Sequence, residues 1–169
     1  MKPTCKSLSR EKEYFLSSIE SNKGIIYKVA NSYCKDVDDR DDLIQEIILQ
    51  LWKAFPSFDP EYKLSTWMYR IALNVAISAY RKASKRSQIL QPLSETAIYL
   101  EEDENEVNDK RDLLQTLIKE LREIDRALIL LYLEGYLYPE IGLMLGISET
   151  NVATKLSRIK QLLKKKLTS

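Results

Sequence analysis

Apolar residues recur along most of this chain at spacings of three and four, which is the period of an amphipathic helix. No stretch shows a strand pattern of comparable strength. The first half of the chain is predicted to form four helices: Glu11–Glu20; Ile25–Cys34, after a loop around 21–24; from the acidic run 36–42 to about Ala54; and from a cap at Ser65 or Thr66 to about Arg81.

The same period returns in the last third of the chain. It predicts a helix over Asp109–Leu121 and another over Arg126–Glu134. Asp125 is expected to cap the second of these, and Gly135 is expected to end it. The fold class predicted from these patterns is all-α.

Residues 137–166 have the pattern of a helix-turn-helix. Pro139 suits the first turn of a short helix, Gly146 supplies the backbone freedom to end it, and Ser148 can cap a second helix that runs to about Lys164. Their apolar residues can share one core, which leaves several basic side chains outside it: Lys155, Arg158, Lys160 and Lys164–Lys166. This pattern is typical of a recognition helix for the DNA major groove, although a plain helical hairpin with a basic end would look similar.

The charges are segregated, although the whole chain of 169 residues carries a net charge of only +1. Residues 1–90 hold 15 basic and 11 acidic side chains, residues 91–112 hold 2 and 8, and residues 113–169 hold 9 and 6. The acidic segment contains Pro92 and lacks sustained periodicity, so a flexible linker is expected there. Two mildly basic lobes joined by an acidic linker favour separate contacts with a polyanion.

The composition argues against an enzyme and against a cofactor. The chain has no histidine, which is the commonest general base and metal ligand, and it has no glycine-rich phosphate loop. Cys5 and Cys34 are its only cysteines, so neither a zinc site nor a disulfide framework is expected. We see no signal peptide and no apolar run of the roughly 20 residues that would cross a bilayer. A cytoplasmic location without membrane insertion is therefore expected.

A line of polar side chains follows the fourth helix at spacings of three to four and contains no carboxylate. With nearby residues it consists of Lys63, Arg70, Asn74, Ser78, Arg81, Lys82, Lys85 and Arg86. Such a face could follow a nucleic-acid backbone, and Asn74 could hydrogen-bond a base edge. Trp67 belongs to the apolar stripe, so the loop residues Phe55, Phe58 and Tyr62 are the freer candidates for stacking on a base.

Three motifs, taken together, resemble the extracytoplasmic-function (ECF) sigma factors, the small promoter-specificity subunits of bacterial RNA polymerase. They are DDLIQEI at 41–47 followed by Leu51-Trp52, STWMYRIALNVA at 65–76, and YPEIG at 138–142 with LGIS at 145–148. The motifs occur in the order that the family has, are separated by an acidic linker and span nearly the whole chain.

The resemblance implies a role for each motif. Asp41, Asp42, Gln45 and Glu46, which by themselves would be interpreted as solvent-facing, become contacts with core polymerase. The resemblance places Asn74 at an unpaired base of the promoter −10 element, with further contacts to this element from Lys63, Arg70, Ser78 and Arg81. It also makes the helix-turn-helix the reader of the −35 element, with contacts from Thr154, Lys155, Arg158 and Lys160.

The same resemblance implies the partners of the chain. These are promoter DNA and core RNA polymerase, through its β′ clamp helices and its β flap, and an anti-sigma protein of the kind that commonly holds such factors inactive. It also implies two small helical domains: residues 1–86 for polymerase binding and −10 melting, and residues 109–169 for −35 recognition, with 87–108 as the linker through the polymerase cleft.

Some positions depart from the family pattern. Arg122 stands where many members have Pro, and Gly142 replaces a usual Ala. Ala153 and Ser157 occupy positions that often carry basic or bulky DNA-contacting residues, which leaves open which bases are read. The main alternative function is a conventional helix-turn-helix regulator that binds duplex DNA without polymerase, and a further one is a helical adaptor with no nucleic-acid role.

Overall fold

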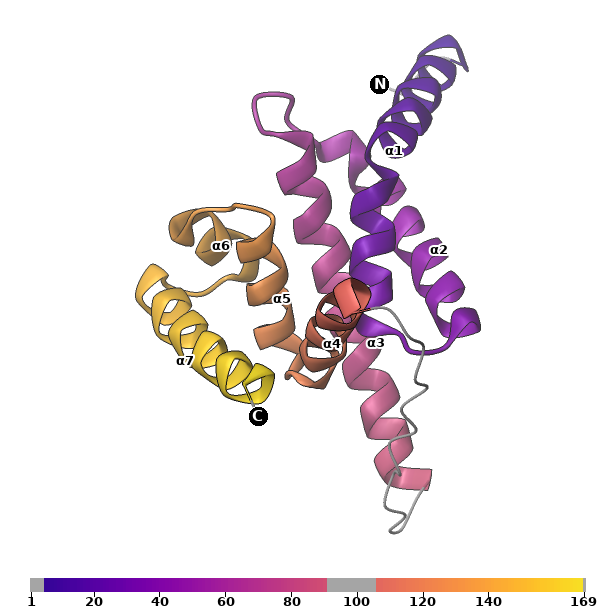
Figure 1. Ribbon diagram of the computed structural model, residues 1–169. Helices are drawn as coiled ribbons and strands as arrows, with labels where there is room; N and C mark the ends of the chain where they lie inside the picture. Colours follow the sequence, from indigo (N-terminus) through magenta and orange to yellow (C-terminus); the bar gives the residue numbers. More distant parts are fainter. Residues whose placement is uncertain (1–4, 91–105, 169) are drawn as a thin grey trace. The chain divides into compact units, whose positions relative to one another are not determined.

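The computed structural model describes residues 5–90 and 106–168, and these form seven α-helices and one short 3₁₀ helix with no strand among them (Figure 1). This confirms the all-α prediction. Most of the predicted linker, 91–105, lies outside the described residues.

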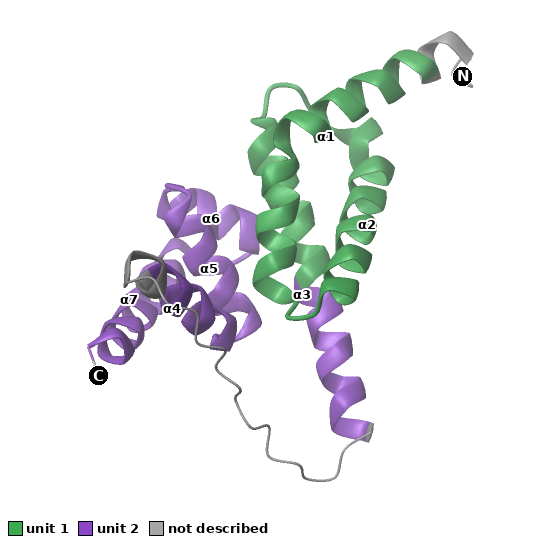
Figure 2. Cartoon of the chain, turned by 45° about the vertical axis from the view of Figure 1, so that its right-hand side comes forward, with its two compact units in different colours: residues 1–76 green, residues 77–169 purple. Residues whose placement is uncertain are grey.

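Two units make up the chain, residues 1–76 and residues 77–169 (Figure 2). The border falls within one long helix, α3 (Leu64–Leu90). The predicted domain limits of 1–86, 87–108 and 109–169 stay a prediction.

The first unit begins with α1 (Cys5–Tyr33), which lies beside α2 (Val37–Ala54). The predicted break between two helices at 21–24 is confirmed as a kink at Asn22, where φ is −123° and ψ is 15°. The predicted loop there is wrong, because α1 continues through the kink. The amide of Asn22 donates to the carbonyl of Ser18 at 2.9 Å, so a side chain stabilises the backbone at the kink.

An aromatic cluster closes one end of this unit, around the 3₁₀ helix η1 (Phe55–Ser57). The ring of Phe55 lies 5.1 Å from that of Phe15 and 6.1 Å from that of Trp67, and the Trp67 ring lies 5.0 Å from that of Phe58. Phe55 is only 7% exposed, so it is a core residue and the prediction that it is free to stack on a base is wrong. Tyr62, at 70% exposure, is the one aromatic residue of the three that remains open to solvent.

The long helix α3 differs from its prediction at both ends. It begins at Leu64, so Ser65 and Thr66 lie inside its first turn, and it continues past Arg81 to Leu90. The extension consists of lysine, arginine, alanine, glutamine and other residues without a glycine or proline, and these sustain a helix even where no apolar stripe does. Its buried residues come from the first half of the helix: Met68, Tyr69, Ala72, Leu73, Ala76 and Ile77.

In the described residues of the second unit, four helices follow α3: α4 (Glu106–Glu120), α5 (Glu123–Leu133), α6 (Tyr138–Leu145) and α7 (Glu149–Leu167). Helix α7 packs against all three of the others. The shared core is almost entirely aliphatic: Leu117, Ile118, Leu121, Ala127, Leu128, Ile129, Leu131, Ile141, Met144, Val152, Leu156, Ile159 and Leu163.

The start of α5 differs from its prediction. The N-cap residue is Arg122, whose carbonyl accepts from the N–H of Arg126 at 2.9 Å, so the predicted Asp125 cap is wrong. Gly135 ends the helix as predicted and adopts a left-handed φ of 85°.

Arg126 is a buried cation inside the second unit, with an exposure of 2%. Its guanidinium donates to the carbonyls of Lys119 and Leu121, the latter at 3.0 Å, at the end of α4. The last carbonyls of a helix lack hydrogen-bond donors within it and carry partial negative charge. A cation there donates the missing hydrogen bonds and balances the charge.

We expect Arg126→Met to destabilise the second unit by about 2 kcal/mol, because buried carbonyls lose their donor. Urea unfolding of the full chain, with hydrogen exchange of the α4 and α5 amides, would measure the loss. Arg122→Met removes an exposed arginine from the same turn and serves as the control. Equal stability of the two variants would contradict a structural role for Arg126.

Candidate nucleic-acid and polymerase interfaces

The helix-turn-helix forms as predicted between α6 and α7. Pro139 lies in the first turn of α6, and the carboxylate of Glu140 accepts from the N–H of Leu137 at 2.8 Å. Gly146 ends α6 with a left-handed φ of 68°. Ser148 caps α7 by accepting from the N–H of Asn151 at 3.2 Å, which confirms the predicted cap.

Gly142, which lies inside α6, is very close to the backbone of the turn between the two helices. Its carbonyl accepts from the N–H of Ile147 at 3.0 Å. A Cβ atom built at Gly142 would lie 2.7 Å from the Ile147 carbonyl oxygen, which is closer than real contacts allow. The departure from the usual alanine at this position therefore has a steric reason in this backbone.

Helix α7 buries Val152, Leu156 and Ile159 and turns its other side to solvent. Thr154 and Arg158 are exposed on that side, one turn apart. Lys155 borders this surface, with its ammonium 3.5 Å from the carboxylate of Asp125 in α5. The structure therefore brings together three of the four residues predicted to contact the −35 element.

Lys160, the fourth predicted residue, lies on a different flank of α7. Its ammonium sits 3.7 Å from the centre of the Tyr132 ring, a cation–π contact. Its interaction with Tyr132, and after it with Tyr138, raises the pKa of Lys160. This position holds α7 against α5, and a DNA contact by Lys160 stays a prediction.

Two polar residues that the sequence analysis did not single out share the exposed side of α7 with Thr154 and Arg158. Asn151 precedes Thr154 by three residues, and Gln161 follows Arg158 by three, and both are exposed. The helical spacing was the available signal, since residues three and four apart are neighbours on a helix surface. Amides are the side chains that pair with adenine in a major groove.

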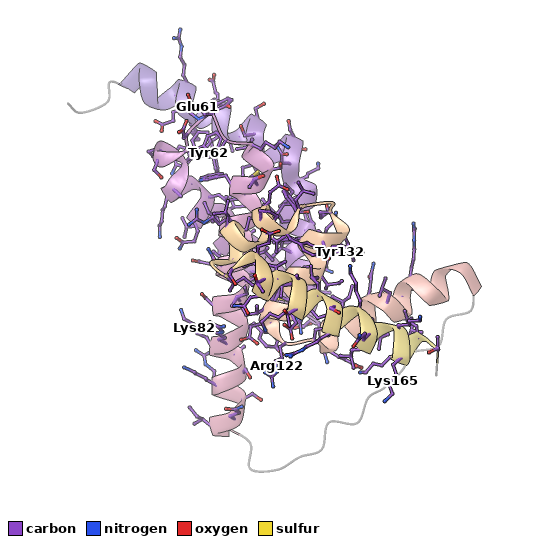
Figure 3. The ribbon with its side chains drawn as sticks, turned by 90° about the vertical axis from the view of Figure 1, so that its left-hand side faces the viewer. Glu61, Tyr62, Lys82, Arg122, Tyr132 and Lys165 are labelled. Atoms are coloured by element: carbon purple, nitrogen blue, oxygen red, sulfur yellow. The ribbon has the colours of Figure 1, made fainter. Side chains whose placement is uncertain are left out.

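The predicted polar line on α3 is exposed throughout. Lys63 at its start, then Arg70, Asn74, Ser78 and Arg81, are all solvent-facing. At 3.6 residues per turn the four positions that lie within α3 fall within an arc of roughly 80°. Lys82 borders the same surface and projects outward from α3 (Figure 3).

Arg81 differs from the rest of this line because it has an ion-pair partner. Its Nε donates to Oε1 of Glu123 at 2.9 Å. This hydrogen bond lowers the pKa of Glu123. Only the Nε donor of Arg81 is used in this pair, so the other guanidinium N–H groups are the ones that can contact DNA while the pair persists.

The predicted polymerase contacts lie along α2. Asp36 caps the helix by accepting from the N–H of Val37 at 2.8 Å, and Asp38 and Asp39 occupy its first turn. Leu43, Ile47 and Leu51 are buried, whereas Asp41, Asp42, Gln45 and Glu46 are exposed. The amide of Gln50 donates to the Glu46 carboxylate at 2.7 Å and so orients it.

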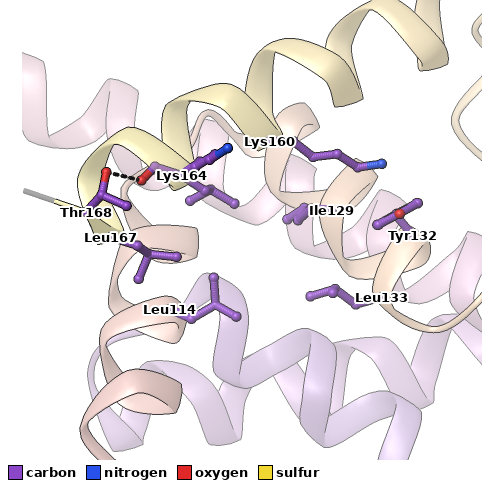
Figure 4. Close-up of a pocket in the computed structure, with 9 residues that line it drawn as sticks. Leu114, Ile129, Tyr132, Leu133, Lys160, Lys164, Leu167 and Thr168 are labelled. Carbon is purple, nitrogen blue, oxygen red and sulfur yellow. Dashed lines mark hydrogen bonds between the residues drawn. The ribbon is translucent and has the colours of Figure 1, made fainter.

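An apolar hollow of about 370 Å³ opens between α4, α5 and α7 (Figure 4). Leu114, Ile129, Leu133, Leu163 and Leu167 supply its apolar lining, with Tyr132, Lys160, Lys164 and Thr168 also lining it. The sequence analysis did not foresee it, because its walls come from three separate helices. It could accept an apolar side chain of a partner.

Nothing in the described part of the chain gathers three or more potential metal ligands. Within those same ranges, no helix combines the length and the apolar character that a membrane crossing requires.

Comparison with known proteins gives two family matches. Residues 19–86 match the model for Sigma-70 region 2, and residues 111–163 match the model for Sigma-70, region 4. The first match contains the α2 and α3 surfaces, and the second contains α5, the helix-turn-helix and the exposed side of α7.

Curated relatives agree with these matches. The chain is 27% identical to the ECF RNA polymerase sigma factor SigW of Bacillus subtilis (strain 168), over 93% of this chain and 90% of that protein. It is 33% identical to the RNA polymerase sigma factor SigZ of the same organism, over 73% of this chain and 72% of that protein.

Solved structures share the fold. CnrH, in complex with the cytosolic domain of CnrY, aligns with a TM-score of 0.66 at 21% identity, over 93% of this chain and 89% of CnrH. The sigma factor RpoE of Bartonella quintana, in complex with the anti-sigma factor NepR, aligns with a TM-score of 0.67 at 20% identity, over 93% of this chain and 96% of RpoE.

The two matches follow one another in the order of the exposed surfaces, and the relatives span most of the chain. The chain therefore belongs to the ECF subfamily of sigma-70 factors, the subunits that bind core RNA polymerase, direct it to specific promoters and assist strand opening.

Proposed function

We propose that three exposed helix surfaces divide the work of this sigma factor. The acidic side of α2 binds core polymerase through its β′ clamp helices, the basic side of α3 binds the −10 element, and the exposed side of α7 reads the −35 element. The observation that carries this division is that each helix keeps one buried apolar stripe and turns a chemically distinct polar surface to solvent.

The α3 surface suits the capture of single-stranded DNA. Asn74 is the only amide in a line that is otherwise basic or a hydroxyl, so it can hydrogen-bond an extruded base while Lys63 and Arg70 contact phosphates. Extruding a base costs a few kcal/mol, and stacking and pocket contacts return about 1–3 kcal/mol per captured base. Opening is therefore favourable only where capture matches the sequence, and no hydrolysis is needed.

The α7 surface suits the major groove of duplex DNA. Thr154 and Arg158 lie where base edges would be met, and Asn151 and Gln161 extend the same surface by a turn on each side. Lys155, held near Asp125, and Lys165 at the end of the helix are placed to contact phosphates.

The predicted domain limits and partners complete this proposal. Residues 1–86 act as the polymerase-binding and −10 domain, 109–169 as the −35 domain, and 87–108 as the linker between them. The β flap of polymerase is a second docking point, and an anti-sigma protein is a further partner, in line with the complex that RpoE forms with the anti-sigma factor NepR. A factor with these partners acts in the cytoplasm. Sigma factors are not enzymes, so we expect this chain to catalyse no reaction itself.

Promoter binding should depend on core polymerase. The dissociation constant of non-specific DNA binding is typically about 10⁻⁴–10⁻⁶ M. Because both lobes carry a low net charge, we expect the free chain to bind DNA with an affinity in this range. Docking on polymerase presents both lobes to DNA at high effective concentration. We expect weak promoter binding by the free chain and tight binding by the holoenzyme in gel shifts at fixed salt. Equal affinities would favour a conventional regulator instead.

Asn74→Ala should impair strand opening and leave duplex engagement intact, because the amide acts only on an unpaired base. We expect at least about a fivefold loss of permanganate reactivity in the −10 region of holoenzyme complexes, given about 1–3 kcal/mol per base. A template with a pre-opened −10 bubble serves as the control and should restore initiation. Normal opening by the variant would contradict the assignment of Asn74.

Lys155→Glu combined with Arg158→Glu should abolish initiation at a −35-dependent promoter while core binding persists. Reversing two cations that face the groove removes contacts and adds repulsion, so a loss of more than about tenfold is expected. Run-off transcription and a core pull-down measure the two properties. Lys12→Glu with Lys28→Glu reverses two exposed cations of α1 and is the matched control. Wild-type transcription by the α7 variant would exclude this surface as the −35 reader.

A further inference from the structure

The outer side of α2 has an apolar residue at its centre. Leu49 is 45% exposed, whereas the other leucines of this helix, Leu43 and Leu51, are buried at 5% and 0%. At 3.6 residues per turn, Leu49 projects roughly opposite to the buried stripe that Ile47 belongs to. Leu49 therefore does not contribute to the core as the buried leucines of this helix do.

Polar residues surround Leu49 on the helix surface. Gln45 and Glu46 precede it by four and three residues and Lys53 follows it by four, so these three are its neighbours, with Asp42 one turn further back. All four are exposed. The predicted polymerase contacts thus form part of a ring around a leucine.

One wall of this surface is rigid. Trp52, three residues after Leu49, is half-buried, and its ring lies 4.9 Å from the ring of Phe15 in an edge-to-face arrangement. The Gln50 amide fixes the Glu46 carboxylate on another side. A partner would meet an apolar centre whose surroundings are already ordered, so little entropy is lost on binding.

The charge of α2 selects the kind of partner. Between Val37 and Ala54 the helix holds five carboxylates against one arginine and one lysine. A complementary surface must be basic at its edges and apolar where it meets Leu49.

We infer that Leu49 is the central apolar anchor of the interface with the β′ clamp helices of core polymerase. This inference rests on the proposed function of α2 and extends it from a set of polar contacts to a leucine enclosed by them. The arrangement is that of a binding hot spot, in which a desolvated apolar residue carries much of the affinity and a polar rim excludes water.

Leu49→Ala should weaken the binding of the full chain to purified core RNA polymerase by about thirtyfold or more, the range of a hot-spot truncation. Alanine is the best helix former, so the thermal unfolding of the free chain should not change. Leu49→Met keeps the apolar volume and should stay within about threefold of the parent protein. Competition for fluorescently labelled parent chain on core polymerase measures all three affinities.

Leu16→Ala provides the matched control, since Leu16 is a leucine on α1 with 54% exposure. A loss for Leu49→Ala without a loss for Leu16→Ala or Leu49→Met supports the inference. Parent-like binding by Leu49→Ala, with binding lost in Gln45→Ala combined with Glu46→Ala, would overturn the anchor and leave the proposed function intact. Failure of the parent chain to bind core polymerase would overturn the proposed function itself.

Discussion

Burial of one apolar stripe per helix is the constraint on which the rest of this protein depends. The stripe decides how each helix rotates about its axis, and the rotation decides which polar side chains reach a partner. In α7, Val152, Leu156 and Ile159 have no exposure above 4%, which leaves Thr154 and Arg158 no direction but outward. Core packing therefore determines which way the candidate surfaces face. A substitution in the core could rotate a helix and turn its polar side chains away from a partner, although none of those side chains is replaced.

Much of the fold could be predicted from the sequence because local signals agreed with tertiary structure. The Asp36 region, Gly135, Gly146 and Ser148 end or begin helices as expected, since capping depends on a few adjacent residues. Prediction failed where a local signal was weak or was overridden. Helix α3 continued to Leu90 without an apolar stripe, because no residue in that stretch stops a helix. Asp125 looked like a cap, yet it lies inside α5 and faces Lys155.

The candidate surfaces were predictable to the level of a helix side, and less so to the level of single residues. The line from Lys63 to Arg81 is exposed, as the spacing predicted. The ion pair of Arg81 with Glu123 and the contact of Lys160 with the Tyr132 ring could not be predicted, because each joins residues that are far apart in the sequence. Such contacts leave no trace in local periodicity. The same holds for the hollow beside Leu133, whose walls meet only after three helices pack.

The close contact between Gly142 and the backbone of the turn after α6 affects which segments can be exchanged between this chain and its relatives. A Cβ atom at Gly142 would meet the Ile147 carbonyl oxygen at 2.7 Å, so an alanine there would force the turn backbone to shift and would change the angle between α6 and α7. Transplanting only α7 from a relative would place the foreign helix at the angle that this chain's turn sets, whereas moving α6, the turn and α7 together would bring the donor's own turn with it. Engineering a new promoter preference into this scaffold therefore calls for the whole motif as the unit of exchange.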